Sequence, residues 1–117
     1  MSDTLFRFPA PGPEPITTDL AGWTKIEGNP TMRYWVQHTA LDGSMISGTW
    51  EATTGTWHAT YQFYEFVHLI DGRITITPDG GPPVTLKPGD AFVVEPTFKG
   101  TWTIEKPVRK HFAIKLK

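Results

Sequence analysis

The sequence predicts an all-β fold. Eleven prolines and eleven glycines interrupt the 117 residues at short intervals. The segments between them are rich in valine, isoleucine, threonine and aromatic residues, which favour strands. No segment keeps an apolar stripe at helical spacing over several turns, so we expect one helical turn at most, at residues 17–23. Short strands at such spacing are typical of a sandwich or barrel.

Three expected strands lie within residues 31–70. Residues 31–38 and 45–51 are two strand-forming segments, and the Asp-Gly pair at 42–43 between them is a turn signal. Residues 59–70 form the third segment. The Asp-Gly pair at 71–72 that follows is expected to close a hairpin.

Five more expected strands follow after residue 72. Residues 73–77 complete the hairpin, and an Asp-Gly-Gly stretch separates them from residues 84–87. A Pro-Gly-Asp turn then leads into residues 91–95. The last two strands are expected over 100–105 and 109–115.

The chain is expected to have one barrel domain and one arm. Residues 1–15 have a proline at every second position from Pro9 to Pro15. Proline cannot donate to a sheet ladder, so this segment is expected to be an extended arm that lies on the body or on a neighbouring subunit. Residues 16–117 form the barrel, and the arm together with exposed aromatic side chains favours a homodimer.

Composition excludes several classes of function. Eleven basic residues against twelve acidic ones give a net charge of −1, with no run of like charge, so neither nucleic acid nor an anionic membrane is an expected partner. The absence of cysteine excludes disulfides, thiolate metal sites and thiol nucleophiles, and it fits a cytoplasmic location. No segment resembles a leader peptide or a membrane span.

Two stretches carry a resemblance to a known family. YEFVHLIDG places Glu65 seven positions before Gly72, and LKPGDAFVVEPTFKGTW gives a Gly-Asp turn before an apolar strand. Together they resemble the cupins, whose motifs are commonly written G-x5-H-x-H-x3-4-E-x6-G and G-x5-P-x-G-x2-H-x3-N. The resemblance implies a single-domain cupin, an RmlC-like jelly-roll barrel of two antiparallel sheets with little helix. In such barrels the motif histidines and glutamate bind a divalent metal.

Most of the histidine positions of these motifs carry other residues. The longer spacing in the first motif places His58 and Thr60 at the two histidine positions, and the shorter spacing places Ala59 and Tyr61 there. In the second motif the histidine position falls on Gly100. A divalent metal needs three or four converging ligands. We therefore predict no metal cofactor, with a weak divalent site at His58 and the motif glutamate as the alternative.

A narrower resemblance covers about residues 22–114. The stretches that carry it are GWTKIEGNP, WVQH, GTWEATTGTW, YEFVHLIDGRITIT and PVRKHF. They resemble the short cupins related to (S)-ureidoglycine aminohydrolase. That resemblance implies metal-dependent ureide hydrolysis as one candidate activity, although the ligands of the true aminohydrolases have no counterpart in this chain.

Strand alternation predicts a polar pair inside the barrel. Glu65 shares a strand face with Val67 and Leu69, and a carboxylate in an apolar barrel requires a proton, a cation or a donor. Lys110 shares a face with Val108 and Phe112, which makes it the expected cationic partner. The alternative is that either side chain reaches the rim and meets only water. His68 lies three positions from Glu65 and should point away from it, toward another sheet or a subunit.

The remaining candidate ligand-binding residues are aromatic or lie near the first motif. Trp102 ends the FKGTW stretch, where metal-binding cupins present their last ligand, and Trp57 adjoins His58. Most of the five tryptophans are expected to fill the core or an interface. The residues predicted to contact a ligand are therefore Trp102, Trp57, His58, Tyr61 and Thr60.

The leading functional hypothesis is that the barrel mouth binds a small polar organic molecule. Glu65, with Lys110, is the candidate acid or base for isomerase, hydrolase or lyase chemistry. The rival hypothesis is a non-catalytic dimeric sensor or accessory module, and a metal-dependent ureide hydrolase is the third. An open cavity lined by Glu65, Tyr61, Trp102 and Lys110 would favour the first, and aromatic rings that fill the barrel would favour the second.

Overall fold

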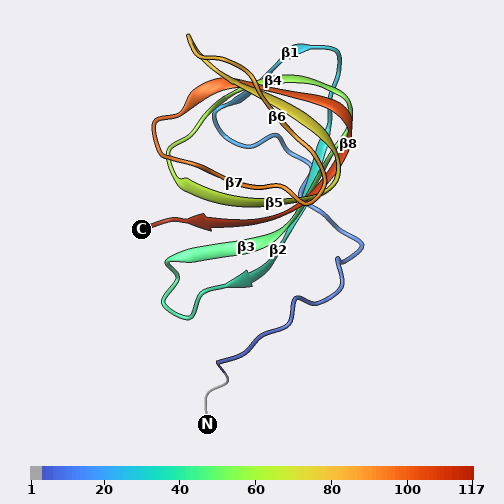
Figure 1. Cartoon of the computed structure of the whole chain (residues 1–117). Coiled ribbons are helices and arrows are strands. Elements are labelled where there is room, and N and C mark those ends of the chain that lie inside the picture. Colours follow the sequence, from blue (N-terminus) through green and yellow to red (C-terminus); the bar gives the residue numbers. More distant parts are fainter. Residues whose placement is uncertain (1–3) are drawn as a thin grey trace.

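The computed structural model describes residues 4–117 and has an all-β fold (Figure 1). Its strands are β1 (Trp23–Glu27), β2 (Met32–Thr39), β3 (Met45–Ala52), β4 (Gly55–Thr60), β5 (Tyr64–Pro78), β6 (Val84–Leu86), β7 (Ala91–Val94) and β8 (Lys99–Lys115). Within the described part of the chain, no helix has the length and apolar character that a membrane crossing requires.

Two long strands, β5 and β8, join the strands into a curled antiparallel sheet. They pair with one another along nearly their whole length. The first half of β8 also pairs with β4 and its second half with β3, while β5 pairs with β7 near its start and with β6 near its end. One layer therefore reads β7–β5–β8–β3–β2 and the other β6–β5–β8–β4–β1. This arrangement confirms the predicted single-domain jelly-roll barrel.

The expected hairpin at Asp71-Gly72 is wrong, because both residues lie inside the continuous strand β5. The pairing of β5 with β8 shifts register three times between Leu69 and Ile74, and Gly72 has a positive φ of 94°. A glycine at positive φ suits a bulge as well as a turn. In the same way, the two expected strands over 100–105 and 109–115 form the single strand β8.

Two further strand predictions need correction. Residues 23–27, at and beyond the expected helical turn, form β1, which pairs with β4. The expected strand over 59–70 is divided, since β4 ends at Thr60 and β5 begins at Tyr64. Tyr61, Gln62 and Phe63 lie in the connection, and this connection becomes the rim of the mouth described below.

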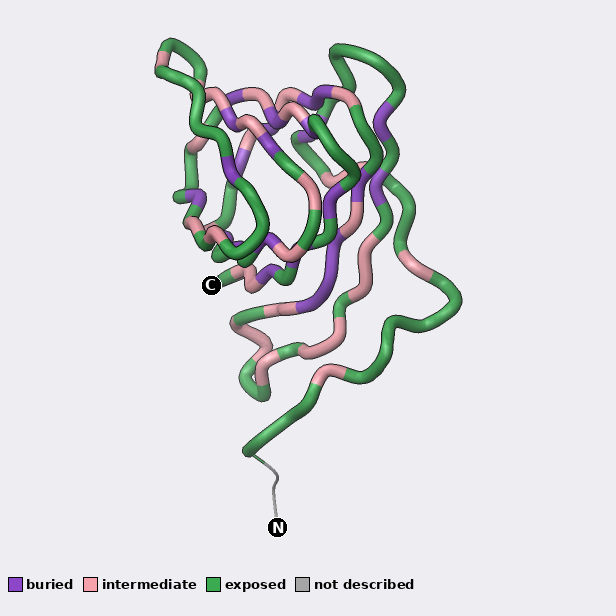
Figure 2. Tube along the Cα trace, turned by 45° about the vertical axis from the view of Figure 1, so that its right-hand side comes forward, coloured by how far each residue is buried: buried purple, intermediate pink, exposed green. Residues whose placement is uncertain are grey.

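The expected arm lies along the outer side of β2. Residues 4–15 contain no strand and are mostly exposed (Figure 2), and the first bridge to the barrel joins Ile16 to Tyr34. Side chains of β2 hold the arm: Trp35 Nε1 donates to the Gly12 carbonyl at 2.9 Å and Gln37 Nε2 donates to the Pro9 carbonyl at 2.7 Å. Residues 1–3 of the expected arm lie outside the described residues.

Aromatic rings fill much of the barrel. The rings of Trp23, Trp50, Trp57 and Trp102 contact one another, with centroid separations of 5.0 to 6.1 Å. Burial of rings this large contributes much of the apolar stabilisation of a small domain. The packed interior leaves little space for a ligand at the centre, so any ligand site must lie toward an end or on the surface.

Candidate functional site

A buried ion pair lies at the centre of the candidate site. Nζ of Lys110 is 2.9 Å from Oε2 of Glu65, and the two side chains are 1% and 6% exposed. Lys110 lies on β8 between the inward-facing Val108 and Phe112, and Glu65 precedes the inward-facing Val67 on β5. Alternation along both strands places the charges in one interior, which confirms the predicted contact.

Tyr61 completes a chain of three polar groups. Its hydroxyl donates to Oε1 of Glu65 at 2.7 Å, so each carboxylate oxygen has a donor. Burial raises the pKa of the Tyr61 hydroxyl well above its usual 10.0, and the adjacent charge of Glu65 raises it further. Tyr61 therefore remains a hydrogen-bond donor across the physiological range.

The ammonium group of Lys110 is enclosed by aromatic faces. Nζ lies 4.6 Å from the ring centroid of Trp50 and 4.7 Å from that of Trp102, distances at which a cation is attracted to an indole face. Burial lowers the pKa of Lys110 below its usual 10.5, whereas the charge and hydrogen bond of Glu65 oppose that shift. The two indoles and the carboxylate together replace the water that the ammonium loses.

A small cavity, here called the mouth cavity, opens onto Tyr61 and Glu65 from the connection between β4 and β5. Its volume is about 160 Å³, and most of its lining is apolar. The lining residues are Leu20, Ala21, Trp23, Thr60, Tyr61, Gln62, Phe63, Glu65 and Ile114. The cavity is smaller than the usual 300–1,000 Å³ of a ligand pocket. It therefore has room for only a small molecule beside the carboxylate.

The structure separates the other predicted ligand-binding residues from this cavity, except Thr60. Trp57 and Trp102 are fully buried in the interior, and Trp102 Nε1 has no hydrogen-bond partner among residues 4–117. His58 lies on the opposite face of β4 from Trp57 and pairs with Asp79 at 3.0 Å. The mouth cavity is lined by Glu65 and Tyr61 but not by Trp102 or Lys110. It therefore differs from the open cavity lined by all four residues that would have favoured the first hypothesis.

The motif positions do not fit a divalent metal. Ala59, Tyr61 and Glu65 face the interior, so the shorter motif spacing describes the barrel, and His58 cannot share a metal with Glu65 because it points outward. A Cβ at Gly100 would clash with the Thr77 carbonyl and the ring of Phe98. Within residues 4–117, no three His, Asp or Glu side chains form a group that could hold a metal ion.

His68 takes the outward orientation that alternation predicts. It is exposed and lies opposite His111 of β8, on the other side of the sheet from Glu65. The interior polar chain is thus limited to Lys110, Glu65 and Tyr61.

Two features that could bind a ligand were not predicted from the sequence. The mouth cavity depends on Trp23 and Phe63, whose positions follow from the unpredicted β1 and the β4–β5 connection. A second charge cluster joins Glu51 to Arg33 and Arg109 on the outer face. The available signal was alternation, since Glu51 and Arg109 each adjoin an inward-facing residue.

Comparison with protein families finds one match. The model of the EutQ-like cupin domain matches residues 39–112, which span β3 to β7 and most of β8. A comparison with curated proteins finds no match. The narrower resemblance to (S)-ureidoglycine aminohydrolase stays a prediction.

Solved structures share the fold at low sequence identity. The EutQ protein of Clostridium difficile is 18% identical with a TM-score of 0.66, over 74% of this chain and 69% of that one. A DUF861 protein of unknown function from Pseudomonas syringae pv. tomato is 23% identical with a TM-score of 0.71, over 87% of this chain and 43% of that one. Ectoine synthase from P. lautus is 17% identical with a TM-score of 0.62, over 86% and 68%.

Proposed function

The chain belongs to the EutQ-like cupin domain family, and we propose that it is a small-molecule-binding cupin whose ligand enters the barrel mouth and contacts Glu65. The observation that carries this proposal is the mouth cavity, because Tyr61 and Glu65 are both in its lining and also in the interior polar chain. A buried carboxylate at the wall of an apolar cavity is an unusual feature in a core.

The cavity favours a small ligand with an apolar body and one hydrogen-bond donor. Glu65 already accepts from Tyr61 and Lys110, yet each carboxylate oxygen has more than one lone pair. An amine, amide or hydroxyl group can therefore bind the same carboxylate. Trp23, Phe63 and Ile114 supply the apolar contacts. No metal takes part in this proposal.

Catalysis by Glu65 is the finer part of the proposal. A carboxylate that is fixed by two donors and faces a cavity has the position of an acid–base group for isomerase, hydrolase or lyase chemistry. Lys110 would act through Glu65, because the ammonium group lies behind the carboxylate and outside the cavity lining. We therefore assign Lys110 a positioning role.

Titration of the full chain with small amines, amides, ureides and alcohols tests the proposal. Amide NMR signals of residues 60–65 should shift in a saturable way with at least one class, and Glu65→Gln should weaken that binding. Glu27→Gln, at an exposed position at the end of β1, is the matched control and should bind as the parent does. Shifts that are absent from residues 60–65 for all classes would refute a mouth site.

A second candidate, a non-catalytic dimeric sensor or accessory module, is supported by the filled interior. Trp50, Trp57 and Trp102 close the barrel centre, and Phe66 and Val93 are 42% and 45% exposed on the outer side of β5 and β7. In this case the outer surface would contact a second copy. Native mass spectrometry separates the candidates, because it reports subunit number and any bound small molecule in one measurement.

A further inference from the structure

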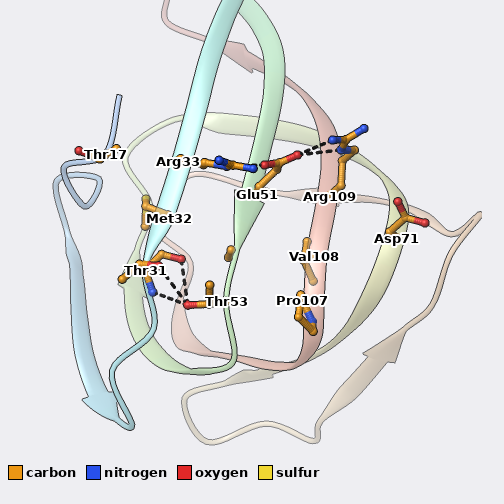
Figure 3. Close-up of a pocket in the computed structure, with 11 residues that line it drawn as sticks. Thr17, Thr31, Met32, Arg33, Glu51, Thr53, Asp71, Pro107, Val108 and Arg109 are labelled. Carbon is orange, nitrogen blue, oxygen red and sulfur yellow. Dashed lines mark hydrogen bonds and ion pairs between the residues drawn. The ribbon is translucent and has the colours of Figure 1, made fainter. Parts of the chain in front are cut away.

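A groove of about 780 Å³ crosses the outer face of β2, β3 and β8 (Figure 3). One wall is a row of charged residues in register on four adjacent strands, namely Arg33, Glu51, Arg109 and Asp71. The opposite wall contains Thr31, Thr53 and Pro107, and Thr17 lies at one end. Between the walls lie Met32, Ala52 and Val108, whose side chains are buried in the core of the barrel. This groove has the volume of an ordinary small-molecule site.

Glu51 holds both arginines in fixed positions. Its Oε1 accepts from Arg33 Nε at 2.6 Å, and its Oε2 accepts from Arg109 Nε at 2.8 Å and lies 2.7 Å from Arg109 Nη2. The Glu51 side chain is 14% exposed, whereas those of Arg33 and Arg109 are 59% and 52% exposed. The carboxylate is thus the enclosed centre of the cluster, and the guanidinium groups extend into solvent.

The two guanidinium groups keep donors that Glu51 does not use. The hydrogen bond from Arg33 to Glu51 uses Nε, and the contacts of Arg109 with Glu51 use Nε and Nη2. Two arginines and one glutamate leave one net positive charge at this wall. A planar guanidinium with free N–H groups matches the geometry of a carboxylate.

Asp71 adds an opposite charge to the same wall. It is exposed, lies beside Arg109 in the register of β5 and β8, and is in no ion pair with the described residues 4–117. With Asp71 included, the charged wall is neutral overall, which disfavours a multiply charged anion. A molecule with one carboxylate and one ammonium group matches both ends. The hydroxyls of Thr31 and Thr53 offer further hydrogen bonds from the opposite wall.

We propose that this outer groove binds a small amino carboxylate, with its carboxylate on Arg33 and Arg109 and its ammonium group beside Asp71. The site is separate from the barrel mouth, because its charged side chains point out of the sheet whereas Glu65 and Lys110 point into it. Binding in the groove is therefore independent of the function proposed for the mouth.

NMR titration of the full chain with glycine, β-alanine and 4-aminobutyrate tests this proposal, with acetate, ethylamine and inorganic phosphate as comparison ligands. At least one amino carboxylate should shift the amide signals of residues 31–33, 51–53 and 107–109 in a saturable way. Arg33→Gln should weaken that binding about tenfold or more, as expected when hydrogen bonds to a charged group are lost. Asp71→Asn should weaken amino carboxylate binding and leave acetate unchanged.

Arg73→Gln is the matched control, since Arg73 is an exposed arginine that pairs with Glu105 at 3.2 Å outside the groove. It should bind as the parent does. Arg33→Lys keeps the charge but loses the planar donor pair, so it should also weaken binding while the fold is retained. Absence of saturable shifts, equal weakening by Arg73→Gln, or tighter binding of phosphate than of every amino carboxylate would each overturn the proposal.

Discussion

Nζ of Lys110 and Oε2 of Glu65 are 2.9 Å apart inside the barrel, where their side chains are 1% and 6% exposed. Lys110 lies opposite Leu69 in the register of β5 and β8, so its side chain extends along the interior to reach Glu65. The ammonium group lies over the rings of both Trp50 and Trp102. Each of these contacts compensates part of the cost of burying a charge. The polar chain and the aromatic core therefore depend on one another.

Removal of the Tyr61 hydroxyl should destabilise the barrel. Tyr61→Phe leaves Oε1 of Glu65 without its 2.7 Å donor in a buried place, and we expect a loss of about 1–3 kcal/mol in the free energy of unfolding. Urea denaturation measures this change. Tyr64→Phe on the same segment is the control and should alter stability by less than about 0.5 kcal/mol. Equal effects of the two changes would mean that the hydrogen bond contributes little.

Loss of the His58 side chain should have only a small effect. His58 pairs with Asp79 on the partly exposed outer face of β4, and exposed pairs contribute about 0–1 kcal/mol. His58→Ala should therefore shift the melting temperature slightly and leave the metal content of the purified protein unchanged. Stoichiometric manganese, zinc, iron or nickel that survives dialysis against a chelator, and that His58→Ala removes, would contradict this expectation.

Glu51 should make stability depend on acidic pH. Burial raises the pKa of Glu51, but the hydrogen bonds and charges of Arg33 and Arg109 outweigh it and hold the pKa below its usual 4.5. The stabilisation is fully present above pH 4.5 and is lost as the pH falls through the lower folded-state value. Urea unfolding between about pH 7 and pH 3 should show a shallower acid loss for Glu51→Gln than for the parent. An unchanged slope would contradict this assignment.

Strand alternation was sufficient to predict the interior pair. On β8, Val108, Lys110 and Phe112 share the buried face, whereas Arg109 and His111 lie on the exposed face. The bulge at Gly72 was not predictable, because an Asp-Gly pair suits a hairpin turn and a bulge equally well. Which one forms depends on the pairing of β5 with β8, which is a contact distant in sequence. The same reason explains why β8 continues through Pro107.

The mouth cavity was harder to predict than the residues beside it. Tyr61 and Glu65 were identified from their motif positions, but the size of the cavity depends on how Trp23 and Phe63 pack at the rim. Packing of large rings is a property of the whole core. Trp102 was expected at a pocket because of its position after FKGT, yet strand alternation directs it into the filled interior. The longer motif spacing uses His58 and the shorter one uses Tyr61. Deciding between them required knowing which of these side chains faces the interior of the barrel.

Deletion of residues 1–15 should leave the barrel folded. The described part of the arm accepts hydrogen bonds from the Trp35 and Gln37 side chains and forms no strand, so the melting temperature should change little. We also expect a homodimer in which the arm adds contact area, so that the deletion weakens association. Sedimentation of both forms over a concentration series measures this. A full-length chain that is wholly monomeric at micromolar concentration would contradict the dimer.

Substitution of both members of the interior pair should be less harmful than the sum of the single substitutions. Glu65→Gln leaves the Lys110 ammonium buried without its counter-charge, and Lys110→Met leaves the Glu65 carboxylate with Tyr61 alone. Each single change should cost about 3–5 kcal/mol in the free energy of unfolding, because an uncompensated charge remains in the core. The double variant removes both charges and should recover part of that loss, which urea denaturation of all four proteins measures as a coupling energy. The control cycle, Arg73→Met with Glu105→Gln, removes an exposed pair and should show single effects of about 0–1 kcal/mol. Small additive effects in the interior cycle would contradict this prediction, because they would show that the pair contributes little to the free energy of unfolding.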